Sequence, residues 1–195
     1  AYTISLEVSN DMGTNSIIRT DYIIVSPAAS CVPAYSTGSS AGDFISLVQL
    51  EGISNASGAS PLPSYTDYSN LTANLIKGSS YTLTLSGGTQ GAANTIAVWI
   101  DYNQDNQFDP SEKLGNVALP AAPGTTDLTF SIPQQANNGT ARMRVRAVRE
   151  VSEIDPCSLY SHGETEDYRV LISPVTYCEP SFDNGSIFGN YISLV

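Results

Sequence analysis

Apolar residues occur along this chain in short runs of about five to eight positions, separated by clusters of Gly, Pro, Asn and Ser. Several runs alternate strictly with polar residues, as in YTLTL at 81–85, and this is the period of a half-buried strand. The run TIAVWI at 95–100 is continuous and is typical of a central strand buried on both faces. Helical periodicity is weak throughout. The pattern predicts an all-β fold, a β-sandwich of jelly-roll or Ig-like type. The expected strands are 44–50, 81–85, 95–100, 128–132, 141–148 and 168–172.

The chain repeats part of itself. Residues 31–48, CVPAYSTGSSAGDFISLV, align without a gap with residues 178–195, CEPSFDNGSIFGNYISLV, and nine of the 18 positions are identical. We interpret residues 28–174 as one complete module and residues 175–195 as the start of a second copy. The spacing from Cys31 to Cys178 is much longer than the ~20–50 residues of a solenoid repeat, so it indicates successive modules. The expected organisation therefore has partial β modules at both ends.

Three cysteines fit this division, because Cys178 would open the next copy. Within the complete module Cys31 would pair with Cys157, and an oxidising compartment would be needed to keep the bond. Two free buried cysteines are the alternative.

The first 27 residues form a separate piece. Alternation at Tyr2, Ile4, Leu6 and Val8 predicts a strand, a turn cluster follows at 10–15, and a second strand is expected at 17–25. The wording YTISLEVSNDMG followed by YIIV resembles the end of a PKD-type immunoglobulin-like domain. Residues 1–27 are accordingly interpreted as its C-terminal strands.

The loop DYNQDNQFDPSE at 101–112 carries the sharpest chemical signal. Oxygen-bearing residues stand at the positions that ligate calcium in the EF-hand spacing. They are Asp101, Asn103, Asp105, Gln107 through its carbonyl, Asp109 and Glu112. The bend at position six, which usually requires glycine, is Asn106, a residue that tolerates positive φ. The loop predicts a Ca²⁺ site, and a solvated acidic turn is the alternative.

A second acidic cluster is GETEDY at 163–168, which we expect just before the last strand. Its residues Glu164, Glu166 and Asp167 could complete the calcium site, cap a buried arginine or face water. The alternation in ARMRVRAV places Arg142, Arg144 and Arg146 on one face of a strand. A Glu–Arg pairing across strands is the simplest structural interpretation.

IDYNQDNQFDPSEKLG, ARMRVRAV and GETEDY together resemble the GEVED domain, with Thr165 in place of the valine. The resemblance runs from Cys31 to about Ser173. It implies a β-rich accessory module of secreted, multidomain bacterial proteins, in which PKD-like neighbours and tandem copies are typical. It supplies no catalytic residues.

The net charge of −11 and a pI near 4.2 argue against nucleic acid as a partner. No apolar run is long enough to span or insert into a membrane. The lone histidine, His162, has no nucleophile elbow beside it, so we expect no enzyme. Tyrosines in apparently polar loops suggest a glycan or surface-polymer site, although they could instead pack with only their hydroxyls at the rim. The candidates are Tyr65, Tyr68, Tyr102 and Tyr160, with Tyr35 beside them.

The expected role is adhesion or polymer binding at the bacterial cell surface or after secretion, with calcium and neighbouring repeats as partners. A spacer in an adhesin or filament, or an accessory to a secreted peptidase, are the alternatives.

Overall fold

The computed structural model describes residues 2–23, 30–89 and 94–176. Among the described residues, nearly all of the regular secondary structure is strand, as the hydrophobic pattern predicts. The strands are β1 (Tyr2–Asn10), β2 (Gly13–Ile23), β3 (Tyr35–Gly38), β4 (Ile45–Leu50), β5 (Ile53–Asn55), β6 (Tyr65–Ile76), β7 (Ser80–Gly87), β8 (Asn94–Ile100), β9 (Lys113–Leu119), β10 (Thr126–Ser131), β11 (Gly139–Arg149) and β12 (Tyr160–Ser173). A single turn of 3-10 helix, η2 (Pro110–Glu112), precedes β9.

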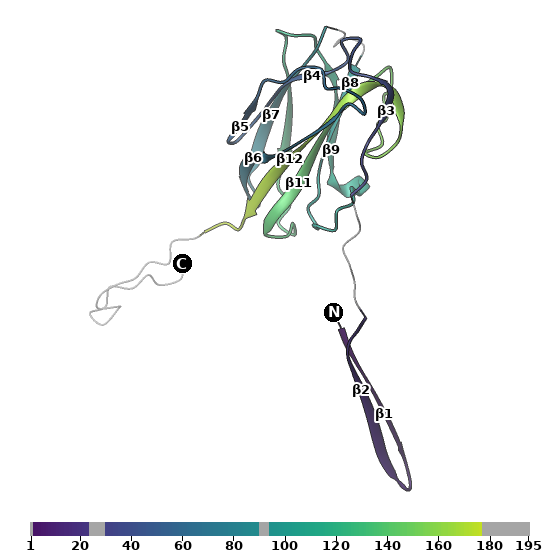
Figure 1. Cartoon of the computed structure of the whole chain (residues 1–195). Helices are drawn as coiled ribbons and strands as arrows, with labels where there is room; N and C mark the ends of the chain where they lie inside the picture. The colour runs from purple at the N-terminus through teal and green to yellow at the C-terminus, as the bar shows by residue number, and fades with distance from the viewer. Residues whose placement is uncertain (1, 24–29, 90–93, 177–195) are drawn as a thin grey trace, which may run out of the picture.

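Two sheets face each other in a β-sandwich (Figure 1), which confirms the predicted fold class. The smaller sheet has the order β10-β7-β4-β5. The larger has the order β3-β12-β11-β8-β9, and β6 also pairs with β12. Both β3 and β6 run parallel to β12, along successive parts of its length. The other ladders of the sandwich are antiparallel.

The core lies between the sheets and follows from strand alternation. From β8, Ile96, Val98 and Ile100 enter it, together with alternate residues of β11 and β12. Leu83 and Leu85 of β7 approach from the opposite sheet. The outer face of the larger sheet is also covered, because Ala97 and Trp99 of β8 pack there with Tyr35, Val148 and Ile154. Burial on both faces explains why β8 is a continuous apolar run.

Several elements differ from the expectation. Strand β12 begins at Tyr160 rather than near residue 168, so GETEDY lies within it instead of before it. The region of Tyr65 and Tyr68 is β6 and not a loop. Its sequence carries many Thr, Asp, Ser and Asn because only two of its side chains, Ala73 and Leu75, are fully buried.

The N-terminal strands form a hairpin whose turn lies at residues 11–12, close to the predicted strand–turn–strand pattern. Every described residue of β1 and β2 is exposed. Leu6 lies opposite Ile17, so one face of the hairpin is apolar and uncovered. The second copy expected from Cys178 onward lies outside the described residues.

Candidate functional site

The loop between β8 and β9 is tied to the sheet at its first residue. The Asp101 N–H donates to the Arg142 carbonyl of β11 at 2.9 Å. The Asp101 carboxylate then accepts the N–H groups of Asp105 at 3.2 Å and Asn106 at 3.0 Å, which closes the chain around it. Asn106 has φ of 67°, the conformation expected at the glycine position. Asp101 is therefore wrapped by its own loop.

The far end of the loop returns to the same place. The two carboxylate oxygens of Glu112 accept the N–H groups of Asn103 at 3.1 Å and Asp109 at 3.0 Å. Asp101 and Glu112 are both only 3% exposed. Burial raises the pKa of each carboxyl above its ordinary value, and the charge of Asp101 raises that of Glu112 further. In the part of the chain that the structure describes, no lysine or arginine forms an ion pair with either group.

The remaining predicted ligands lie in the same loop. Asn103 Nδ2 donates to Asp105 Oδ2 at 3.1 Å, and the Gln107 N–H donates to Asp105 Oδ1 at 2.8 Å. Asp109 is exposed at the start of the 3-10 turn. Among the described residues, His, Cys, Asp and Glu side chains alone form no group of three or more suited to a metal. A cation here would therefore also need the amide and carbonyl oxygens of Asn103 and Gln107, which are the hard ligands that calcium accepts.

Asp167 is the partner of the central arginine of β11. Arg144 donates from Nε and Nη2 to the two Asp167 carboxylate oxygens at 2.8 and 2.7 Å, and both residues are buried. Arg142 lies 3.7 Å from the same carboxylate. The expected Glu–Arg pairing is wrong. Glu164 and Glu166 alternate to the opposite face of β12, because successive residues of a strand point to opposite sides.

Arginine and aromatic side chains are interleaved on this outer face. The Arg144 guanidinium lies 4.8 Å from the Phe108 ring centre and 5.9 Å from that of Tyr65. Arg146 lies between the rings of Tyr35 and Tyr160, at 5.0 and 4.7 Å. These are cation–π distances, and buried pairs of this kind contribute about 1–2 kcal/mol each.

Arg144 and Arg146 also hydrogen-bond to Cys31 and to the segment around Cys157, residues 153–158, which we call the disulfide segment. Arg144 donates to the carbonyls of Cys31 and Pro156 at 3.0 Å each, and Arg146 donates to those of Asp155 and Ser158. The disulfide predicted between Cys31 and Cys157 is present and joins residues 126 positions apart. The disulfide segment is thus fastened by one covalent bond and two buried guanidinium groups.

Glu164 and Glu166 instead face the space between the sheets. Glu164 accepts the N–H groups of Ile45 and Ser60, at 2.9 and 2.8 Å. Glu166 accepts the hydroxyls of Ser57 and Tyr168, at 2.7 Å each. Burial raises the pKa of Glu166 to about 7 and also raises that of Glu164. These carboxylates fasten the 56–64 connection to β12, and they do not reach the 101–112 loop.

None of the candidate tyrosines is an exposed platform. Tyr102 is buried, and Tyr65, Tyr68 and Tyr160 are half-buried. The Tyr65 hydroxyl donates to Asp167, and Tyr68 stacks on Tyr168 with ring centres 5.5 Å apart. Tyr35, also considered, is buried against Arg146. The packing alternative describes them better.

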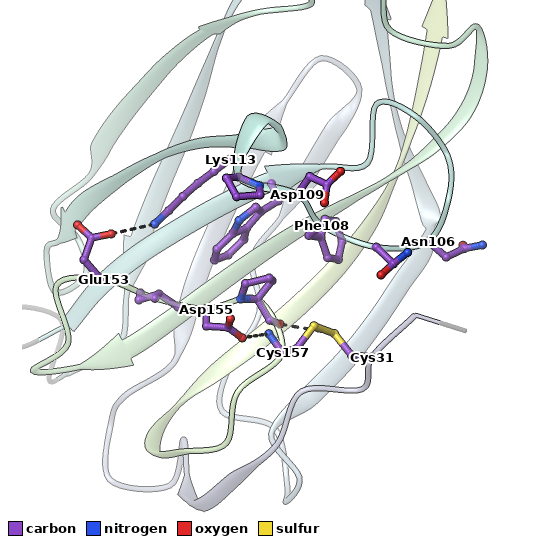
Figure 2. Close-up of a pocket in the computed structure, with 13 residues that line it drawn as sticks. Cys31, Asn106, Phe108, Asp109, Lys113, Glu153, Asp155 and Cys157 are labelled. Atoms are coloured by element: carbon purple, nitrogen blue, oxygen red, sulfur yellow. Dashed lines mark hydrogen bonds and ion pairs between the residues drawn. A yellow bond between two sulfur atoms is a disulfide. The ribbon is translucent and has the colours of Figure 1, made fainter. Parts of the chain in front are cut away.

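A cleft of about 680 Å³ opens beside the loop and the disulfide (Figure 2). One wall is the Asn106–Pro110 part of the loop, and the other is the Glu153–Cys157 segment with Cys31. Phe108 contributes aromatic surface, and Trp99, which also lines the cleft but is only 2% exposed, has its ring centre 6.4 Å from that of Phe108. Sequence reasoning missed this site because its walls come from segments that only the disulfide and the sheet bring together.

Residues 95–171 match the model of the GEVED domain. This stretch contains all of β8 except Asn94, together with the 101–112 loop, the three arginines and the acidic segment of β12. No curated protein matches the chain. Two solved structures give low similarity scores. A chitin binding domain from Burkholderia pseudomallei has a TM-score of 0.35 and 12% identity over 51% of this chain. This chain spans 56% of that domain's length. The sulfur carrier protein SoxY from Chlorobium limicola f thiosulfatophilum has a TM-score of 0.30 and 11% identity, covering 72% of this chain and 86% of that one.

No helix in the described part of the chain has the length and apolar character needed to cross a membrane.

Proposed function

We propose that this chain contains a non-catalytic, calcium-stabilised extracellular β module of the GEVED type, which serves a larger secreted or surface protein in adhesion or in binding glycans or surface polymers. The GEVED match over residues 95–171 supports the module type. The Cys31–Cys157 disulfide supports an oxidising, extracytoplasmic location, since such bonds seldom persist in a reducing cytosol.

The observation that carries the calcium proposal is the buried carboxylate pair Asp101 and Glu112. Two carboxyl groups with raised pKa values, held in one loop and ion-paired to no lysine or arginine among the described residues, are costly as anions. A divalent ion would offset that cost. Asp101, Asn103, Asp105 and Glu112 would ligate it through side-chain oxygens, Gln107 through its carbonyl, and Asp109 directly or through water.

Thermal unfolding of the protein in EDTA and in CaCl₂ tests the proposal. Ca²⁺ at one hundred times its Kd stabilises by about 2.7 kcal/mol, which raises the Tm of a domain this size by about 5–10 °C. Asp101→Asn and Glu112→Gln are expected to remove most of that shift. Asp127→Asn, at an exposed position of β10, is the matched control and should retain it.

The refuting result is direct. Purified protein that takes up no calcium in metal analysis, and melts at one temperature in both buffers, would show that the loop is an acidic turn without a resident ion.

A spacer role is the second candidate. It is favoured by the repeat between residues 31–48 and 178–195, because tandem modules form extended chains. Small-angle scattering of a chain holding two modules, with and without EDTA, distinguishes the two. A calcium-dependent increase in length without any ligand binding would favour the spacer.

A further inference from the structure

We propose that the cleft between the 101–112 loop and the disulfide segment binds a neutral oligosaccharide. This inference rests on the proposed binding role and supplies it with a site and a ligand class. The cleft volume of about 680 Å³ lies within the ~300–1,000 Å³ of small-ligand sites.

The floor of the cleft is apolar and fixed. Phe108 is half-buried, and its ring is held by Arg144 at 4.8 Å and by Trp99 at 6.4 Å. Pro110 and Pro156 extend the apolar surface on either side. A pyranose ring has an apolar face of C–H groups that can lie against such a surface, and little side-chain entropy is lost because the ring of Phe108 is already positioned.

The rim supplies hydrogen-bond partners of the kind that hydroxyl groups need. Asn106 and Gln107 contribute amides, and Asp109, Glu153 and Asp155 contribute carboxylates. Asp155 is oriented by the N–H groups of Cys157 at 2.8 Å and Ser158 at 2.7 Å. A few convergent polar groups around an apolar floor are typical of sites that fix the orientation of a small ligand.

Charge narrows the ligand class. Three rim carboxylates and a net charge of −11 disfavour an anionic ligand. A cationic ligand meets a different obstacle, because the protein's own cations already lie over the aromatic rings. Lys113 Nζ is 5.6 Å from the Trp99 ring centre, and Arg144 is against Phe108. A neutral polyol suits the site best.

Because residues of the 101–112 loop form one wall of the cleft, saccharide binding should depend on calcium binding to that loop. Asn106–Pro110 belong to the loop proposed to enclose the ion, while Cys31 and Cys157 anchor the opposite wall covalently. Ordering the first wall before the ligand arrives would lower the entropic cost of binding. Calcium and saccharide should therefore strengthen each other's binding by the same factor.

Fluorescence gives a direct assay, because Trp99 is the single tryptophan of the chain and lines the cleft. The full chain in CaCl₂ would be titrated with cello-, xylo-, manno- and N-acetylchito-oligosaccharides, with oligogalacturonate as the anionic comparison. We expect at least one neutral series to change the Trp99 emission saturably, and calorimetry to give the same Kd. Oligogalacturonate should have no effect.

Two variants locate the site. Phe108→Leu removes the aromatic ring but keeps an apolar side chain, and should weaken binding about tenfold or more. Gln107→Ala removes a rim amide, leaves the backbone carbonyl in the loop, and should weaken binding several-fold. Gln49→Ala, an exposed glutamine of β4 in the opposite sheet, should bind like the unmodified protein.

The outcomes separate this inference from the calcium proposal. Absence of binding by every neutral series, or unchanged binding in both cleft variants, overturns the cleft assignment and leaves the EDTA result standing. Saccharide binding that is lost in Phe108→Leu, in a protein whose melting is unaffected by EDTA, supports the cleft and overturns the metal.

Discussion

Replacing Asp167 by asparagine is expected to destabilise the module strongly. The change removes the negative charge that faces Arg144 across the β11–β12 ladder, where Arg144 and Asp167 are direct register partners. Arg144 is fully buried and Asp167 is 1% exposed. Asparagine can accept only one of the two guanidinium hydrogen bonds, and the positive charge stays buried.

The magnitude follows from burial. Breaking a buried ion pair by removing one partner costs about 3–5 kcal/mol, so the Tm of a domain this size should fall by roughly 6–20 °C. The Tyr65 hydroxyl, which donates to Asp167 at 3.0 Å, loses a charged acceptor as well. Glu153→Gln is the control. Its ion pair with Lys113 is 3.4 Å long but 86% exposed at the glutamate, and exposed pairs contribute about 1 kcal/mol or less.

Urea unfolding followed by far-UV circular dichroism, at constant calcium, measures both variants. The single variants Arg144→Met and Asp167→Leu and their double variant form a cycle, and the double variant should recover much of the loss, because it leaves no buried charge without a partner. A loss below about 1 kcal/mol in Asp167→Asn, or a double variant as unstable as the two single changes added together, would refute the reasoning.

Three further predictions concern separate parts of the chain. Burial raises the pKa of Glu166 to about 7. The stability that its protonated carboxyl group contributes is therefore present below about pH 4.5 and is lost as pH rises through 7. Glu166→Gln should reduce the difference in unfolding free energy between pH 5 and pH 8 by on the order of 2–3 kcal/mol, whereas the exposed Glu51→Gln should leave that difference unchanged. The double variant Cys31→Ser/Cys157→Ser should lower the unfolding free energy by about 4–5 kcal/mol for a loop of this length, and a loss under about 1 kcal/mol in urea titrations would contradict the chain-entropy account. Deleting residues 1–27 should leave the calorimetric Tm of the module within about 1–2 °C, since every described residue of β1 and β2 is exposed; a large drop would show that the hairpin is part of the module.

The sequence predicted the features that are local in the chain. The 101–112 loop is contiguous, so its oxygen spacing and the positive φ of Asn106 could be deduced from residue order alone. Strand β8 could also be predicted from the sequence, because burial on both faces requires a continuous apolar run. The hairpin β1–β2 followed from strict alternation.

Other features depended on register and could not be deduced. That Asp167, rather than a glutamate, meets Arg144 follows from where β12 begins and how it pairs with β11. Strand β6 was missed because its first half, YTDYSN, is mostly polar and shows no strand alternation. Its pairing with β12 is also interrupted by a register shift between Tyr168 and Arg169. The cleft is lined by residue 31, residues 99, 106–110 and 113, and residues 153–157, and no spacing in the sequence indicates that they meet.

The alternation within β12 has a consequence for how the chain finds its native pairing. Glu164 and Glu166 must reach serine and backbone donors between the sheets, while Asp167 must reach a guanidinium on the other side. A register shift of one residue between β12 and β11 would turn every side chain of β12 to the opposite face. Glu164 and Glu166 would then lose their donors between the sheets, and Asp167 would lose its guanidinium partner. A register shifted by one residue is therefore disfavoured on both faces of β12, so the acidic segment helps to specify the native pairing of β11 with β12.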